Sequence, residues 1–138
     1  MRAFRRVGLV LIIGILWAIG ISEAQDGLTK RDAQGPVTVA VTLLAAPSLG
    51  EPLKAKVVLD THSVSLDGIK FEEAFALRTP DGVEAPPVAV EQATGSGHHR
   101  TAVLVFSAPT KAGAVNIVSK NIGGVAERSF SWELSGGR

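Results

Sequence analysis

Three histidines and one aspartate are the side chains of this sequence best suited to bind a ligand. His62 lies in the segment Asp60-Thr61-His62-Ser63, and the other two histidines lie in Gly97-His98-His99-Arg100. Imidazole and carboxylate groups together are ligands that Cu(II) and Zn(II) accept in proteins. The two segments therefore predict a transition-metal site, with copper or zinc as the ion and with His62, His98, His99 and Asp60 as its ligands.

Each histidine segment borders a run of residues that reads as a strand. Residues 53–60 alternate between apolar and polar side chains, and residues 100–106 are nearly all apolar beyond Thr101. Binding residues often lie in the loops at strand ends, and neighbouring strands would bring the two segments together. In an extended chain His98 and His99 point to opposite faces, so both bind one ion only if they lie in an irregular loop.

The same residues allow two other interpretations. In the first, His62 and one histidine of the pair hydrogen-bond to loop backbone, and Arg100 pairs with Asp60 or Asp67 as a structural clamp. In the second, a calcium ion is bound, although the sequence contains no Asp-x-Asp-x-Asp-Gly loop. The calcium ligands would then be Asp60, Asp67, Glu72 and Glu73.

The residue types argue against an enzyme. The chain contains no cysteine, which excludes thiol catalysis, iron–sulfur clusters, blue copper and cysteine-bound zinc. Ser63 and Ser96 each lie near a histidine, but residues 93–97 lack the first glycine of a nucleophile elbow. Trp132 is the one tryptophan beyond residue 24, and alternation places it in the core rather than on a sugar-binding platform. We therefore expect a protein that acts by binding.

The N-terminus predicts export. Residues 1–6 are basic, residues 7–21 are uncharged and apolar, and Ser22-Glu23-Ala24 places small residues three and one positions before a cut ahead of Gln25. This pattern is typical of a signal peptide over residues 1–24. The alternative is an uncleaved anchor, since a run shorter than about 20 residues can still span a membrane by tilting or by thinning the bilayer. Either reading places the rest of the chain in the periplasm or at the cell surface.

The remaining 114 residues have the size of one ordinary domain. The leader carries three arginines and one glutamate, so the full chain's charge of +1 becomes about −1 without it. That balance gives no indication of nucleic-acid binding. Residues 25–35 are polar and without period, and we expect a flexible linker there, followed by a single domain over residues 36–135.

About seven short strands separated by turns predict an all-β fold, an immunoglobulin-like or fibronectin-like β-sandwich. Residues 71–79 allow either a helical turn or a strand, and a strand is favoured. Pro86-Pro87 predicts a short edge strand carried by Val88 and Val90, whereas residues 100–106 are typical of a central strand. The other expected strands are 37–43, 53–60, 114–120 and 125–134, the last with Arg128, Phe130 and Trp132 on one face.

The pair Asp60-Thr61-His62-Ser63-Val64-Ser65-Leu66 and Gly97-His98-His99-Arg100, followed by Val103-Leu104-Val105-Phe106, resembles a class of uncharacterised exported or membrane-anchored prokaryotic β-sandwich domains. The resemblance covers residues 36 to 134 and implies that the two segments work as one unit, without implying an activity. Such domains often carry aspartate where this chain has Ser65, so the resemblance gives no acidic ligand at that position.

Two functions follow as expectations. The first is an exported, non-catalytic binding domain whose histidine patch takes a divalent transition metal. The second is a protein-interaction or assembly module of the cell envelope, which would use a sheet edge or a loop face. In the second case the histidines are structural.

Overall fold

The structure is a computed structural model that describes residues 27–136 of the chain. The expected signal peptide, residues 1–24, lies outside the described residues. None of the helices in residues 27–136 is long and apolar enough to cross a membrane.

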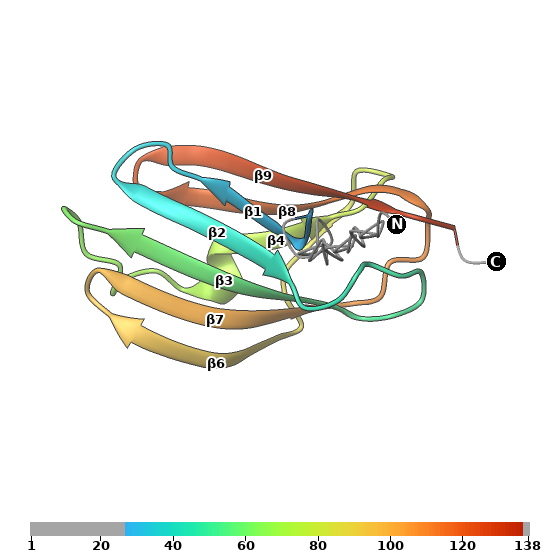
Figure 1. Cartoon of the computed structure of the whole chain (residues 1–138), viewed down its shortest axis with the longest axis horizontal. Coiled ribbons are helices and arrows are strands. Elements are labelled where there is room, and N and C mark those ends of the chain that lie inside the picture. The colour runs from blue at the N-terminus through green and yellow to red at the C-terminus, as the bar shows by residue number, and fades with distance from the viewer. Residues whose placement is uncertain (1–26, 137–138) are drawn as a thin grey trace, which may run out of the picture.

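Two antiparallel sheets make up the fold, which is compatible with a β-sandwich and confirms the all-β prediction (Figure 1). The five-stranded sheet has the order β1 (Thr29–Asp32), β2 (Val37–Leu43), β3 (Leu53–Thr61), β7 (His99–Phe106) and β6 (Ala89–Ser96). The four-stranded sheet has the order β5 (Glu84–Ala85), β4 (Phe75–Arg78), β8 (Gly113–Ile122) and β9 (Val125–Leu134). The short helix α2 (Phe71–Ala74) leads into β4.

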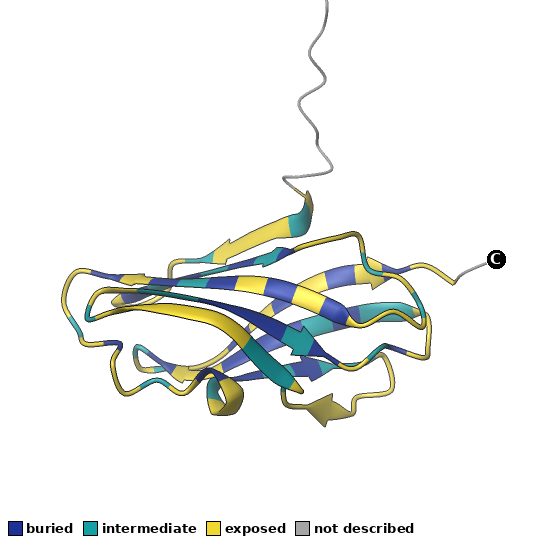
Figure 2. Cartoon of the chain, turned by 90° about the horizontal axis from the view of Figure 1, so that it is seen from below, coloured by how far each residue is buried: buried dark blue, intermediate teal, exposed yellow. Residues whose placement is uncertain are grey.

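The core lies between the two sheets, and the alternation of the sequence decides which side chains enter it. Along β3 the pattern is strict, with Leu53, Ala55, Val57 and Leu59 buried and Lys54 and Lys56 exposed. Strand β2 alternates between buried and partly buried residues, and β9 alternates between buried and exposed residues from Arg128 to Leu134. Figure 2 shows this change of burial along the strands. Burial of these aliphatic and aromatic side chains stabilises a fold that has no cysteine.

The prediction of a flexible linker over residues 25–35 is wrong at its centre, because residues 29–32 form β1. This strand pairs with β2 from Thr29 opposite Thr42 to Asp32 opposite Val39. Contacts to β9 also hold it: the Trp132 Nε1–H donates to the Gly27 carbonyl at 2.9 Å, and the Lys30 ammonium lies 5.7 Å from the Trp132 ring centre. Polar residues can form such a strand because an edge position asks for backbone pairing and not for a buried face.

Three further expectations are corrected. The described residues contain nine strands rather than about seven, since β1 and β5 were not expected. The ambiguous segment 71–79 contains both alternatives, α2 and then β4, rather than a strand alone. Residues 100–106 form a strand next to edge strand β6, where Thr101 and Val105 stay partly exposed on the outer face instead of being covered on both sides.

The strand register places the loops at two opposite ends of the fold. We call one the histidine end; it comprises loop residues 33–36, 62–70, 97–98 and 123–124. We call the other the terminal end; it comprises loop residues 44–52, 79–83, 86–88 and 107–112. The described chain both begins and finishes at the terminal end, because Thr29 lies opposite Thr42 and Leu134 lies opposite Gly113 (Figure 1).

Candidate functional site

The fold brings the two histidine-bearing segments together. Strands β3 and β7 are antiparallel neighbours, and Asp60 near the end of β3 lies directly opposite His99 at the start of β7. The loop that follows β3 and the turn that precedes β7 therefore lie side by side at the histidine end.

Backbone hydrogen bonds join this loop and this turn into one unit. The Thr61 N–H donates to the His98 carbonyl at 2.9 Å, and the Leu66 N–H donates to the Gly97 carbonyl at 2.8 Å. In return, the Gly97 N–H donates to Oδ1 of Asp67 at 2.7 Å. Neither segment can change its position without breaking contacts to the other.

Thr61 shapes the first turn of the loop. Its side chain is buried, and the hydroxyl donates to the Pro36 carbonyl at 2.8 Å. The same oxygen accepts from the backbone N–H groups of Ser63 at 3.3 Å and Val64 at 3.4 Å. A threonine hydroxyl that bonds to backbone two residues on is a common way to start a turn. Here it fixes the direction in which His62 leaves β3.

Asp67 accepts hydrogen bonds that favour its ionised form. The Gly97 N–H is the main cause that lowers the pKa of this carboxyl, and the Ser65 hydroxyl and the nearby Arg100 charge act in the same direction. Partial desolvation opposes the shift but does not cancel it. Asp67 is therefore a carboxylate that holds the loops together, rather than one that is free to bind a cation.

His99 and Asp60 form a side-chain pair on the outer face of the five-stranded sheet. Nδ1 of His99 is hydrogen-bonded to Oδ1 of Asp60, and the two side chains remain 61% and 54% exposed. A carboxylate on one ring nitrogen orients the imidazole and leaves the other ring nitrogen to face a ligand. The pair therefore presents an oriented imidazole to solvent.

The other two predicted ligands lie close by in the loops. His62 follows the end of β3, and His98 lies in the turn between β6 and β7; both are exposed. Within residues 27–136 no group of three or more His, Cys, Asp or Glu side chains is placed to hold a metal ion. Two of the four predicted ligands, Asp60 and His99, thus contact each other, whereas His62 and His98 do not complete a cluster with them.

The calcium candidates are not gathered either. Glu72 and Glu73 lie exposed on α2, where the Glu73 carboxylate is 3.5 Å from the Lys70 ammonium. Asp67 is engaged by the Gly97 N–H, and Asp60 is engaged by His99. The structure thus spreads these four carboxylates over separate contacts.

Arg100 acts as a clamp, but its partners are not the expected carboxylates. Its Nη1 donates to the carbonyls of Leu66 at 2.8 Å and Ile69 at 2.5 Å, and its guanidinium lies 4.7 Å from the centre of the Phe71 ring. The reason is its register: Arg100 lies opposite buried Leu59 and so points to the inner side of the sheet, away from Asp60. It ties the loop before α2 to β7.

A second arginine binds the backbone at this end, and the sequence did not predict that role. Arg128 of β9 is only 2% exposed, and its guanidinium donates to the carbonyls of Gln34 at 2.8 Å, Val37 at 2.9 Å and Ile122 at 3.2 Å. Burial lowers the pKa of Arg128, and the carboxylate of Asp32, 3.8 Å from Nε, opposes that shift. The available signal was the alternation of β9, which put a charged residue on the inner face beside Phe130.

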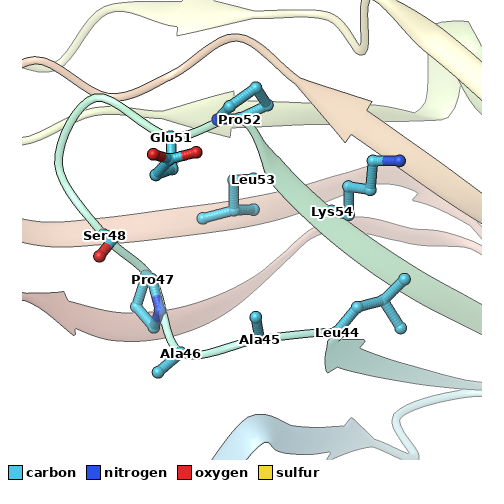
Figure 3. Close-up of a pocket in the computed structure, with 9 residues that line it drawn as sticks. All are labelled: Leu44, Ala45, Ala46, Pro47, Ser48, Glu51, Pro52, Leu53 and Lys54. Carbon is cyan, nitrogen blue, oxygen red and sulfur yellow. The ribbon is translucent and has the colours of Figure 1, made fainter.

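A hollow lies at the opposite, terminal end. It has a volume of about 350 Å³, and the loop between β2 and β3 forms its walls (Figure 3).

No family model matches the chain, and no curated protein or solved structure matches it either. The function is therefore inferred from the chain's own geometry.

Proposed function

We propose that this chain is an exported, non-catalytic β-sandwich domain that acts by binding, and that the histidine end is its binding surface. The proposal rests mainly on one observation, the hydrogen bonds that hold residues 61–67 and 97–98 together as one unit. Loops held in this way present their side chains with little loss of conformational freedom on binding. Export follows from the basic and apolar leader, which places the domain in the periplasm or at the cell surface.

The order of the strands supports an immunoglobulin-like fold. The sequence β2-β3-β7-β6 in one sheet matches the A-B-E-D order of that fold, and β4-β8-β9 in the other matches C-F-G. Strand β1 is then an addition before the first strand, and β5 is an addition beside the C strand. In this scheme the histidine end carries the B–C, D–E and F–G loops.

The surroundings of the Asp60–His99 pair fit binding better than catalysis. A hydrolase of the serine type needs a serine hydrogen-bonded to the histidine, within a site that excludes water. Ser96 is the cross-strand neighbour of His99, but both lie on an exposed face of the sheet. An open surface of this kind supports recognition of a partner better than a chemical step.

A divalent transition metal is the first ligand we propose for this surface. The observation in its favour is the Asp60–His99 pair, which orients one imidazole, with His62 and His98 on the adjoining loops. Copper or zinc would need the side chain of His62, with or without that of His98, to turn toward the pair as a further ligand while the loop backbone stays in place.

The test is a titration of copper and of zinc into the exported domain, made without a histidine tag, in wild type, His62→Ala and His99→Ala. A metal site predicts stoichiometric binding that either substitution weakens at least tenfold. Lys56→Ala is a matched control on the same outer face, since it removes a side chain that ligates no metal. Binding weaker than about 0.1 mM in wild type would exclude a metal function, because transition-metal sites with three protein ligands bind far more tightly.

A protein partner in the cell envelope is the second ligand we propose, because the exposed loop residues of the histidine end are held in place by backbone contacts. A photo-crosslinking residue placed at Ser63 in cells should give one adduct of defined mass. The same residue at Ser131, on the exposed face of β9, should give none. Equal adducts at both positions would show that the histidine end is not the binding surface.

A further inference from the structure

Three large apolar side chains that are exposed lie on separate loops at one end of the domain. Among the described residues they are Leu44, 52% exposed, Val83, 59% exposed, and Val88, 65% exposed. Leu44 directly follows β2, Val83 closes the turn between β4 and β5, and Val88 directly precedes β6. All three positions belong to the terminal end, where the described chain begins. Single exposed apolar side chains are ordinary, so it is their common location that needs a cause.

Leu44 lies beside two hollows at this end. One is the hollow of Figure 3, in which residues 44–47 form one side and residues 51–53 form the other. The second has a volume of about 390 Å³ and lies where the chain enters the domain; its lining residues are Leu28, Thr29, Thr42, Leu43 and Leu44. Leu44 thus shares a hollow with Leu28, the residue that precedes β1.

Contacts between the loops keep this end in one shape. The Gly50 N–H donates to the Pro109 carbonyl at 3.0 Å, and the Lys111 ammonium lies 3.2 Å from the Asp81 carboxylate. The Val88 N–H donates to the Val105 carbonyl at 2.8 Å. The exposed apolar side chains are therefore carried by loops and strand ends that are bound to their neighbours.

The sequence contains an apolar segment shortly before the residues that enter this end. Residues 7–21 are uncharged and apolar, and residues 22–26 connect them to Gly27. Even when fully extended, that connection spans at most about 20 Å. If residues 7–21 cross a bilayer, the terminal end is held near the lipid surface, whereas the histidine end lies at the far side of the domain.

We propose that residues 7–21 remain in the mature protein as a membrane anchor and that the terminal end rests on the surface of the same bilayer through Leu44, Val83 and Val88. Three aliphatic side chains are too few to hold an untethered domain on a membrane. A tether changes this, because contact becomes intramolecular and the side chains need only set the orientation. The histidine end then faces away from the lipid. This inference does not depend on which ligand the histidine end binds.

The test uses the whole 138-residue chain inserted into vesicles of phosphatidylethanolamine and phosphatidylglycerol. The chain has no cysteine, so a single fluorophore can be attached at Val88→Cys, or at Ser63→Cys on the histidine end as the control. Lipids with a nitroxide on the headgroup quench fluorophores that lie at the surface. We expect quenching at position 88 to be at least threefold stronger than at position 63. Equal quenching at the two positions would overturn the proposal.

A second variant separates apolar contact from tethering alone. A fluorophore at Thr110→Cys, in the exposed loop after β7, is compared with and without Leu44→Ser, Val83→Ser and Val88→Ser together. The three serines should reduce its quenching at least twofold, because the tether then holds the domain near the lipid without fixing its orientation, and unchanged quenching would overturn the apolar contact. The mass of the protein purified from native membranes should correspond to a chain that keeps residues 7–21. A chain that begins at Gln25 would overturn the anchor. Neither result changes the outcome of the metal titration, so the two proposals fail independently.

Discussion

Gly97 and Asp67 are bound to each other across two loops that are thirty residues apart in the chain. The Gly97 N–H donates to the Asp67 carboxylate at 2.7 Å. The Gly97 carbonyl accepts from the N–H of Leu66, the residue before Asp67, at 2.8 Å. Both polar groups of one backbone residue thus bind neighbouring positions of the other loop. The positions of His62 and His98 are coupled through this contact.

Loss of the Asp67 carboxylate should destabilise the fold in a pH-dependent way. The Gly97 N–H lowers the pKa of Asp67 below its ordinary value of 3.8, so the stabilising contribution is present above that value and is lost as the pH falls through the lower pKa of the folded state. We expect Asp67→Ala to be less stable than wild type at pH 7 and to approach it at pH 2.

Urea denaturation at the two pH values measures this effect. Ser65→Ala is the matched control, because it removes a weaker donor to Asp67 and leaves the Gly97 contact in place. A deficit of Asp67→Ala that is equally large at pH 7 and pH 2 would show that the charge of the carboxylate is not responsible.

Two glycines of the β6–β7 hairpin should differ in their tolerance of alanine. Gly95 has φ +87°, and a Cβ there would lie 2.1 Å from the His99 carbonyl oxygen. Gly97 has φ +65°, with no atom within 4 Å of a Cβ. Gly95→Ala should therefore cost more than about 2 kcal/mol of unfolding free energy, and Gly97→Ala about 1 kcal/mol. Chemical denaturation measures both, and similar costs would contradict the close approach of β6 to His99.

Removal of the buried guanidinium should be severely destabilising. Arg128→Met leaves the carbonyls of Gln34, Val37 and Ile122 without their donor, at a cost of about 3 kcal/mol or more. Arg128→Lys keeps the charge but cannot reach three carbonyls with one planar group, so it should rescue stability only in part. Thermal and urea unfolding test the ranking. Full rescue by lysine would mean that charge alone is required.

Strand β1 should contribute measurably to stability. Removal of residues 25–32 from the chain without its leader deletes β1, one of the two strands that pair with β2, and the carbonyl that accepts from Trp132. Trp132 is the single tryptophan of that chain, so its fluorescence should shift to longer wavelength as its indole becomes more exposed to water. Lys30→Ala is the milder control, since it removes the cation near the ring and keeps the strand. An unchanged spectrum would contradict the packing of residues 27–32 on β9.

Strand interiors were predictable because burial imposes a period of two, as in β3 and β9. β1 was not predictable, because Thr29-Lys30-Arg31-Asp32 has no apolar face and is a strand only through its pairing with β2. The proximity of the two histidine segments followed from strand adjacency. The partners of Arg100 and Arg128 could not be predicted in this way. They depend on which loop carbonyls lie within hydrogen-bonding distance of each guanidinium, and the local sequence gives no signal of that distance.

The outer edge of β6 has a consequence for the behaviour of the protein at high concentration. Its pairing with β7 shifts register between Glu91 and Thr94, and Gln92 within that interval has φ +49°. A strand interrupted in this way offers another chain no continuous row of donors and acceptors to extend. Copies of the domain crowded on one surface should therefore not extend their sheets into one another along this edge.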